Sequence, residues 1–568
     1  MLFPRDVIFF FVFGVLFIFL APKSGLAKKE EIRMSERVQK NSSYLNGKST
    51  TGTTTRVKDT SSVSGMCPIC IHDCPILCEI SLSAFRGREA LYPETVQFGA
   101  STAASLKDWR LDWSHFNIQG GLFKVEGVEE NPDVAIFQNV STATKVGGIS
   151  LKLPIMTGAF GSTEVAHKHW DGLATGAALS GLSVTIGENV SGMDTEAKFT
   201  NGKITYSKDL KRRVESYRNF WDGKHGEVII QTNVEDQRSG VDVYALSKLE
   251  VNVIERKWGQ GAKAIGGEVR IKDLKKAILV KNRGYMVIPD PEDPEVQKAF
   301  KEGVFRTFER HSRVGIPKEK SFIEDVEWLR TQDAKRVFLK TGGFRPSAVA
   351  YTMKIASEAK IDALTFDGAG GGTGMSPVSM MNEMNIPTVY LEALVLKCAR
   401  ILKTKGRHVP DLIMAGGFIE ETSILKALAM SNFGEGPLVK AVLMARSPIT
   451  AVMKSNYFLK LSHENRLPRV FAERYGVMPE KFFIATPELR KKYAKRFSEI
   501  PFEAIGVYTY LTERVGTGLK QMMAGTHKWK LDLLNRDDLM SLSDRASKVT
   551  GIPTAEEVEK DAIERILE

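Results

Sequence analysis

Cysteine is scarce in this sequence, and most of it lies in one place. Only 5 of the 568 residues are cysteine, which excludes a small secreted fold held together by many disulfides. Four of them fall between residues 67 and 78, and this clustering predicts a shared ligand or a local disulfide pattern. Cys398 stands alone in a helix-like run, so it is expected to be a thiol that serves packing.

Charge of one sign forms no obvious stripe, and the composition is not that of a disordered chain. Apolar residues make up 43% and charged residues 26% of the sequence, which is ordinary for a globular enzyme. The net charge of +11 is interpreted as spread along the chain, so nucleic acid is not expected as a partner. Attraction to an anionic membrane face or to anionic metabolites explains such a charge better.

Long apolar runs are also few, and the one that stands out is residues 7–21, VIFFFVFGVLFIFLA. Its length is short for a membrane-spanning helix and typical of the core of a signal peptide. Gly25 and Ala27 would suit a cleavage site, and the protein would then be exported. More basic residues follow the run than precede it, and no twin-arginine pair is present, which favours an anchor with the catalytic part in the cytoplasm. Residues 1–27 are therefore interpreted as a hydrophobic anchor or signal segment. Residues 28–65 are interpreted as a flexible linker, because residues 41–65 are rich in Ser, Thr and Gly.

The clustered cysteines open a predicted N-terminal segment, residues 66–150. Cys67, Cys70, Cys74 and Cys78 have the spacing C-x2-C-x3-C-x3-C, close enough for four thiolates to hold one iron–sulfur cluster. Zinc also accepts four thiolates, and two disulfides would form if this part of the chain were exported. Cysteine spacing constrains the ligands better than it identifies the metal, so the three alternatives stay open.

Eight short apolar runs, most of them followed by a turn and a helix-like stretch, dominate residues 151–455. This alternation predicts a parallel sheet, and eight units predict closure into an α/β TIM (β/α)8 barrel. The long interval 260–336 is expected to form a cap over the site. Residues 456–568 are expected to form a helical C-terminal extension that serves packing and subunit contact in a homo-oligomer. The apolar runs are 153–160, 183–189, 227–233, 251–259, 337–343, 362–368, 411–417 and 441–447.

The strongest functional signal is the stretch Ile361–Pro377, IDALTFDGAGGGTGMSP. A predicted buried strand ends at Asp367 and opens into a glycine-rich loop that includes Gly371 and Gly372. Glycine lets the backbone approach a ligand closely, so that its N–H groups can face an anion. A flexible surface loop without function is the alternative, but loops on such a scaffold commonly carry the chemistry.

The pattern DGxxGGTGxxP in this stretch resembles the FMN-binding synthase domain of glutamate synthases, especially the short, FMN-only members of archaea and bacteria. The resemblance covers roughly residues 67–555. It implies an FMN-dependent oxidoreductase in which reduced FMN delivers a hydride to an imino acid formed from ammonia and 2-oxoglutarate or a similar 2-oxo acid. Electrons would arrive through the cysteine cluster from a ferredoxin-like donor or a membrane redox partner.

A phosphate site is expected after the seventh and eighth apolar runs, because TIM barrels often bind phosphate there. Gly416 and Gly417 follow the seventh run, and Ala445, Arg446 and Ser447 follow the eighth. The alternative is that the two glycines only form a turn.

The flavin ring itself is assigned largely through the resemblance. Lys340 lies within an apolar strand, where burial without a partner would be costly, and it matches the family lysine at the ring. The alternative is a surface lysine whose stem alone is buried. The resemblance also implies flavin contacts for Thr157, Gly158, Thr185 and Gln231.

The substrate site is expected near the fourth run. Glu255 and Lys257 are two residues apart and therefore share one face of a strand. The following IERKWGQGAK resembles the family's GQGAKPG motif, whose lysine, here Lys263, belongs to the site for 2-oxo acid carboxylates. Lysines beside a glutamate could clamp a dianion, whereas an internal ion pair without chemistry is the alternative. Asp367 would orient this site or the ring.

Three departures from full glutamate synthases qualify the resemblance. No amidotransferase domain and no Cys after the initiator Met are present, so ammonia would come from a separate subunit or from solution. Cysteines are absent from residues 448–455, so the N-terminal cysteines would replace the usual cluster. AIGGEVR stands where the family has Pro-Gly after Lys263, which favours a related flavin and iron–sulfur oxidoreductase acting on another substrate, such as an amino-acid derivative. A non-catalytic barrel subunit is the alternative from a different functional class.

Overall fold

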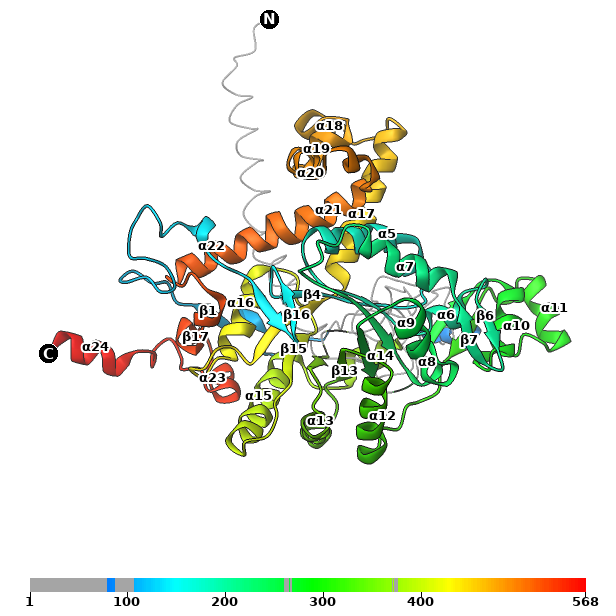
Figure 1. Cartoon of the computed structure of the whole chain (residues 1–568), viewed down its shortest axis with the longest axis horizontal. Helices are drawn as coiled ribbons and strands as arrows, with labels where there is room; N and C mark the ends of the chain where they lie inside the picture. Colours follow the sequence, from blue (N-terminus) through cyan, green and yellow to red (C-terminus); the bar gives the residue numbers. More distant parts are fainter. Residues whose placement is uncertain (1–78, 87–106, 260–264, 266–267, 370, 372–375) are drawn as a thin grey trace, which may run out of the picture. The chain divides into compact units, whose positions relative to one another are not determined.

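The centre of the structure is a closed barrel of eight parallel strands with helices around it (Figure 1). The computed structural model describes residues 79–86, 107–259, 265, 268–369, 371 and 376–568. The strands pair in the order β13-β14-β15-β16-β4-β5-β8-β9, so the predicted TIM barrel is confirmed. The barrel strands are β4 (Ile155–Phe160), β5 (Val184–Ile186), β8 (Val228–Thr232), β9 (Val253–Lys257), β13 (Arg336–Gly342), β14 (Ala363–Asp367), β15 (Asp411–Ala415) and β16 (Val439–Met444).

Apolar side chains fill the amino-terminal half of the barrel interior. Met156, Ile229, Val253, Phe338 and Ala363 belong to one buried cluster to which several strands contribute. Side chains two positions apart on a strand point to the same face. The next inward positions along these strands therefore lie in the carboxyl-terminal half of the interior.

A β-hairpin closes the amino-terminal end of the barrel. Its strands β2 (Thr144–Val146) and β3 (Ile149–Leu151) pair antiparallel and join the interior cluster. Gly147 in the turn has φ of +51° and packs against the ring of Phe338, while its N–H donates to Asp411 at 2.7 Å. Glycine is required here because a side chain would meet the ring and because the backbone is left-handed.

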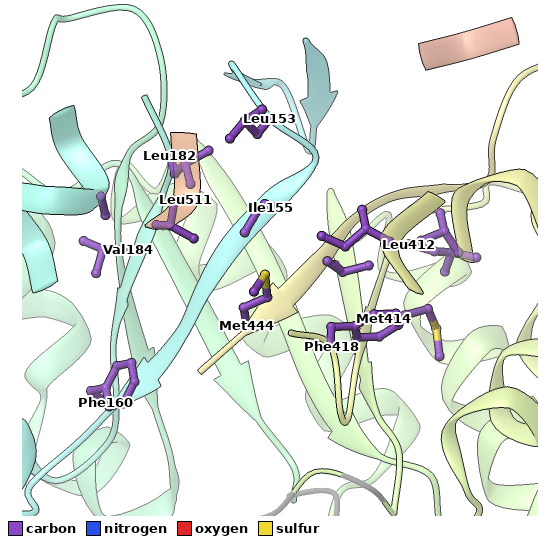
Figure 2. Close-up of a cluster of buried hydrophobic side chains, with 14 of the residues drawn as sticks. Leu153, Ile155, Phe160, Leu182, Val184, Leu412, Met414, Phe418, Met444 and Leu511 are labelled. Atoms are coloured by element: carbon purple, nitrogen blue, oxygen red, sulfur yellow. The ribbon is translucent and has the colours of Figure 1, made fainter. Parts of the chain in front are cut away.

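The main hydrophobic core lies between the barrel and its helices. Figure 2 shows part of this core, with Ile155 and Met444 on strands of the barrel and Leu511 from the C-terminal extension. Local sequence starts the helices: the Thr163 hydroxyl accepts a hydrogen bond from the N–H of Ala166 at 3.2 Å and caps the first of them. The helices around the barrel are α5 (Glu164–Leu179), α7 (Lys208–Arg218), α8 (Val234–Ser239), α9 (Val241–Lys248), α12 (Glu319–Thr331), α13 (Pro346–Glu358), α15 (Thr388–Thr404), α16 (Glu421–Met430) and α17 (Arg446–His463).

The interval between β9 and β13 contains a small subdomain of its own. Its three strands form an antiparallel sheet in the order β10-β12-β11, with a separate core that includes Val269, Val280 and Phe308. Its elements are β10 (Glu268–Ile271), α10 (Leu274–Asn282), β11 (Met286–Ile288), α11 (Pro294–Lys301) and β12 (Phe308–His311). We call residues 268–313 the insertion.

The C-terminal extension is mainly helical. The predicted boundary between residues 455 and 456 falls inside α17, and a π-helical stretch, Thr509–Gly516, joins α21 to α22. A short strand, β17 (Leu539–Ser541), pairs antiparallel with β1 (Phe116–Ile118), so this extension packs against residues that precede the barrel. Its helices are α18 (Arg469–Tyr475), α19 (Pro479–Phe482), α20 (Thr486–Tyr493), α21 (Phe502–Tyr508), α22 (Thr517–Gly525), α23 (Asp544–Thr550) and α24 (Lys560–Leu567).

The chain divides into two compact units, and the barrel belongs to the unit formed by Thr95–Ser105 and Trp109–Glu568. Of the other unit, the structure describes α4 (Glu79–Arg86) and residues 107–108. In the part of the chain that is described, no helix is both long and apolar enough to cross a membrane. The predicted membrane segment, residues 7–21, lies outside this part.

Candidate active site

Polar side chains replace apolar ones in the carboxyl-terminal half of the barrel interior. Gln231, Glu255, Lys340 and Thr365 each lie two positions after a member of the interior apolar cluster, so they point inward. Thr185 points inward as well, because Val184 and Ile186 belong to the outer core. All five are at most 6% exposed. Such a layer at the carboxyl end of a TIM barrel is where this fold places its chemistry.

Two lysines stand side by side in this layer. Lys340 on β13 is in register with Lys257 at the end of β9, and their side chains are only 7% and 8% exposed. The Lys340 ammonium lies 3.6 Å from a carboxylate oxygen of Asp367. The Lys257 ammonium donates to Glu188 at 3.0 Å. Each buried cation is therefore paired, as burial of charge requires.

The pKa values in this layer move away from their ordinary range. Burial lowers the pKa of Lys257, while the neighbouring charge of Glu188 opposes that change. Burial acts to raise the pKa of Glu188, but the charge and hydrogen bond of Lys257 outweigh it and hold that pKa low. Burial raises the pKa of Glu255 against the charge of Lys340. The site thus contains a carboxyl group that holds its proton more readily than usual.

Three buried polar atoms in this layer have no hydrogen-bond partner within the described ranges. They are Oε1 of Gln231 and the hydroxyl groups of Thr185 and Thr365. The amide group of the same glutamine donates to Glu255 at 2.5 Å, which fixes the direction of the free oxygen. Buried polar atoms are almost always satisfied. These three consequently indicate a polar ligand that enters the barrel mouth.

A second acidic group, Asp236, lies beside the first pair. Both of its carboxylate oxygens accept the N–H of Asn189, at 3.1 and 3.0 Å, and the side chain is 2% exposed. The insertion adds Arg310, which is 1% exposed and whose charge acts on both Asp236 and Glu188. Its guanidinium lies over the ring of Tyr285, 5.1 Å from the centroid.

The insertion is fixed to the loops that follow β5 and β8. The Tyr285 hydroxyl donates to Asn189 at 3.1 Å, and both the backbone N–H and the guanidinium of Arg313 donate to Glu235 at 2.8 Å. The predicted cap is therefore present as a folded element at the carboxyl end of the barrel. It carries one buried arginine, Arg310, into the site.

These groups form a band of buried and half-buried charges, which we call the charge row. Neighbours in the row are linked by the ion pairs above or by the electrostatic effects of one group on the pKa of the next. The charge row consists of Asp236, Arg310, Glu188, Lys257, Glu255, Lys340, Asp367 and Arg446.

The turns after β15 and β16 have the geometry of an anion cradle. Gly416 and Gly417 have φ of +114° and +97°, and a Cβ on Gly417 would meet open space. Ala445 is the N-cap of the 18-residue helix α17 and has no side chain that caps the first N–H groups. Free N–H groups at a helix N-terminus attract anions. Burial lowers the pKa of Arg446, the next residue, while the charge of Asp367 opposes this change.

Comparison with known proteins finds a family similarity in part of the chain. A sequence model described as the conserved region in glutamate synthase matches residues 312–442. The resemblance that the glycine-rich stretch carries is thereby confirmed.

The relatives agree with this family region at low identity. A glutamate synthase large subunit-like protein of Rhizobium meliloti is 24% identical over 323 residues, 54% of this chain and 58% of that protein. An archaeal-type glutamate synthase [NADPH] of Thermotoga maritima is 30% identical over 113 residues, 19% of this chain and 22% of that protein. The chain thus spans at most 58% of the length of these two relatives.

Solved structures align loosely with the barrel. A soluble mutant of the membrane-associated (S)-mandelate dehydrogenase of Pseudomonas putida aligns with a TM-score of 0.39 at 14% identity, covering 76% of this chain and 88% of that chain. A mandelate oxidase mutant aligns with a TM-score of 0.39 at 12% identity, covering 74% and 86%. The barrel assignment rests on the strand pairing of this chain.

The region that matches the glutamate synthase model contains only part of the site. Lys340, Asp367 and the glycine turn at Gly416 lie inside residues 312–442. Glu255 and Lys257, by contrast, come from β9, outside the matched region. The two halves meet because β9 and β13 are neighbours in the closed barrel.

The structure places the remaining predicted residues as follows. The Thr157 side chain faces the outer core, and its hydroxyl donates to the carbonyl of Ser183 at 3.1 Å. Gly158 packs closely against Ala445, where an added Cβ would come within 2.5 Å of that side chain. Gly371 lies against the carboxylate of Asp367. Lys263, Gly372 and the cysteines Cys67, Cys70, Cys74 and Cys78 lie outside the described residues.

Sequence reasoning missed three members of the charge row. Glu188 and Asp236 follow strands β5 and β8 by two and four residues, so the rule that chemistry gathers at carboxyl ends of strands could have indicated them. No comparable signal marks Arg310, because it comes from an insertion whose docking depends on tertiary packing.

Proposed function

We propose that this chain is an FMN-dependent oxidoreductase of the glutamate synthase type, which reduces an imino acid, formed from ammonia and 2-oxoglutarate or a similar 2-oxo acid, to an amino acid. The observation that carries the proposal is the charge row, with Lys257 and Lys340 buried side by side at the barrel mouth. Two buried cations in one polar layer suit an anionic cofactor and an anionic substrate.

The described residues fit FMN. The unpartnered atoms of Thr185, Gln231 and Thr365 can meet the polar edge of a flavin ring, and Lys340 can place a positive charge beside it. The turns at Gly417 and Ala445, with the N-terminus of α17, suit the phosphate. When bound, FMN supplies hydride transfer between an electron donor and a substrate.

The charges of the site favour a dianionic substrate. When Glu255 and Asp236, the two carboxyl groups with raised pKa, hold protons, the four cations of the charge row face two carboxylates. The remaining positive charge is available to the carboxylates of a dicarboxylic 2-oxo acid. Lys257 would bind one of them, and its ion pair with Glu188 at 3.0 Å fixes its position.

Reduction of a neutral imine adds a hydride to the carbon and a proton to the nitrogen. Glu255 is the best candidate to hold that proton, on a carboxyl oxygen, because burial raises its pKa. The donor of electrons is proposed to be a ferredoxin-like protein or a membrane redox partner, and a separate subunit or the solvent would supply ammonia. The N-terminal segment would anchor the protein, with its catalytic part in the cytoplasm.

A related oxidoreductase with a different substrate is the second candidate. The sequence AIGGEVR after Lys263 departs from the family motif for the 2-oxo acid site, and an amino-acid derivative would then occupy the barrel mouth. The charge row supports either substrate, since both carry carboxylates.

Anaerobic purification of the full chain tests the proposal. We expect a flavin spectrum, FMN released on denaturation, and amino-acid formation from 2-oxoglutarate and ammonium with a chemically reduced viologen as electron source. Flavin without this activity would favour the second candidate. Protein that takes up neither flavin nor iron during reconstitution would contradict both candidate functions and leave a non-catalytic barrel.

Iron and zinc analysis, repeated after Cys67, Cys70, Cys74 and Cys78 are changed to Ser, separates the metal alternatives.

Gly417→Ala is expected to weaken FMN binding severalfold and to destabilise the fold by about 1 kcal/mol, because the left-handed backbone disfavours a side chain. Gly406→Ala is the matched control, since Gly406 also has a positive φ, +63°, and open space around a Cβ. Both variants should lose similar stability in urea unfolding, and only Gly417→Ala should lose flavin affinity in fluorescence titration. Equal flavin affinity in the two variants would remove Gly417 from the phosphate site.

A further inference from the structure

The positive charge of the protein is concentrated in one part of the C-terminal extension. Residues 454–496 contain eleven lysines and arginines against four glutamates, a net charge of +7 out of the +11 of the whole chain. The interpretation that this charge is spread along the chain is therefore wrong. We call residues 454–496 the basic lobe; it comprises the end of α17 and the short helices α18, α19 and α20 (Figure 1).

The basic residues of the lobe face solvent, and most of them lack acidic partners. All eleven are exposed. Four of them pair with glutamates, as Arg469 does with Glu473 at 2.6 Å. The other seven form no ion pair with any residue that the structure describes. They are Lys454, Arg474, Lys481, Arg490, Lys491, Lys492 and Lys495.

Large apolar side chains are exposed among these charges. Val470 and Ile484 are each 76% exposed, which is unusual for residues of this kind in a folded element. Four further side chains are between 46% and 56% exposed. They are Tyr457, Tyr475, Val477 and Met478.

An aromatic cluster supports this surface from beneath. Phe471 lies 4.7 Å from Phe458, 5.1 Å from Tyr475 and 5.4 Å from Phe482, measured between ring centroids. Phe483 continues the contacts to Phe502 of α21 at 5.8 Å. Buried residues of the lobe, such as Leu459, Phe483 and Leu489, belong to the main hydrophobic core. The exposed apolar side chains therefore stand on a packed element.

We propose that the basic lobe is a membrane-contact surface that rests on an anionic lipid bilayer. Its exposed apolar side chains would enter the boundary between headgroups and acyl chains, and its lysines and arginines would lie at the level of the lipid phosphates. This arrangement combines the two forces that hold peripheral proteins on membranes: burial of apolar area and attraction to anionic lipid. It does not rest on the proposed catalytic function.

A lipid surface fits these residues better than an acidic protein. The six apolar side chains are distributed over a helix end, a short helix and two connecting loops, and a bilayer accepts them without a matching shape. The sequence also predicts a membrane segment at residues 7–21, so that a lipid surface would be close to the chain. The basic lobe would then orient a protein that the N-terminal segment only tethers.

Site-specific photocrosslinking in the full chain tests this assignment. The photoreactive residue p-benzoylphenylalanine is placed at Ile484 or, as a control, at Ile566 of α24, which is 81% exposed. Both proteins keep the N-terminal segment, so any tether acts equally on the two positions. After irradiation with vesicles of phosphatidylcholine containing about 30% phosphatidylserine, mass spectrometry should find about tenfold more lipid adduct at position 484 than at position 566.

Charge variants give the second arm of the test. Arg490→Gln, Lys491→Gln and Lys492→Gln together should lower the lipid adduct at position 484 about tenfold, as should vesicles without phosphatidylserine. Equal adduct yields at positions 484 and 566 would overturn the proposal. A yield at position 484 that stays the same in the triple variant and with vesicles lacking phosphatidylserine would also overturn it. Adducts at position 484 that join it only to protein would assign the surface to a protein partner or a second copy of the chain instead.

Discussion

Replacing Lys340 with methionine is expected to weaken FMN binding about ten- to a hundredfold, because a buried charged hydrogen-bond donor is lost. The side chain of Lys340 is 7% exposed and lies 3.6 Å from Asp367. A positive charge at the flavin ring stabilises the anionic reduced form. Its loss should lower the midpoint potential of bound FMN by about 30–60 mV, the equivalent of about ten- to a hundredfold in the equilibrium constant. Fluorescence titration and spectroelectrochemistry measure the two effects.

Two further variants separate this role from general effects of charge and packing. Lys335→Met removes the same charge just before β13, from a side chain that is 57% exposed and pairs with Asp333, so it should change neither quantity. Lys340→Arg keeps the charge, so the midpoint potential of bound FMN should change little. If Lys340→Met and Lys335→Met bind FMN with the same affinity and potential, Lys340 is not at the ring.

Such a lysine could be located from the sequence because its surroundings are strongly patterned. A strand inside a closed barrel is covered on both faces, so it is seen as a continuous apolar run, and a charged residue within such a run stands out. The same reasoning located all eight strands: six lie within one predicted run each, and β13 and β16 begin one and two residues before theirs.

The partners of the charged residues were harder to predict. Glu255 and Lys257 share a strand face, and the sequence therefore favoured a shared site or an ion pair between them. In the structure Lys257 pairs with Glu188, whereas Glu255 accepts a hydrogen bond from Gln231. Spacing along one strand gives direction, but partners across a barrel depend on strand order and register, which local sequence does not encode.

The insertion marks a further limit of prediction from sequence. Its length indicated a separate element between the fourth and fifth strands, and such an element is present. Its antiparallel sheet and the burial of Arg310 beside Asp236 and Glu188 depend instead on contacts between segments distant in sequence. Arg313, for example, pairs with Glu235 across 78 residues.

Asp236 is expected to make the barrel less stable as the pH rises from 5 to 8. Burial is the main reason that the pKa of this carboxyl is raised from 3.8 to about 7, against the N–H groups of Asn189 and Asn233, which lower it. The unfolded chain loses the proton first, so the protonated group favours the folded state at low pH. That stabilisation declines as the pH rises through about 7. Its loss between pH 5 and 8 should be about 2–3 kcal/mol.

Urea unfolding followed by tryptophan fluorescence, at several pH values, measures this effect. The free energy of unfolding of the native chain should fall relative to that of Asp236→Asn by the stated amount between pH 5 and 8. Glu420→Gln is the control, because hydrogen bonds from Thr422 and Ser423 outweigh burial and lower the pKa of Glu420. The contribution of Glu420 to the free energy of unfolding is complete above the pKa of the unfolded chain, so it stays constant between pH 5 and 8. Parallel profiles for the native chain and Asp236→Asn would show that Asp236 does not titrate there.

Ionisation of Asp236 should also change substrate binding in the charge row. The charge of Glu188 raises the pKa of Asp236, and the charge of Arg310 lowers the pKa of both carboxyl groups. Ionisation of Asp236 above pH 7 therefore adds a negative charge beside the Glu188–Lys257 pair. A dianionic substrate held by Lys257 would then bind more weakly, so its affinity should decline between about pH 6 and 8, as the folded protein loses this proton, whereas most of the loss of stability occurs below about pH 7. In Asp236→Asn, the part of each pH dependence that comes from this carboxyl should be absent, both in the free energy of unfolding and in the affinity for substrate. Loss of both would show that one ionisation affects folding and substrate binding.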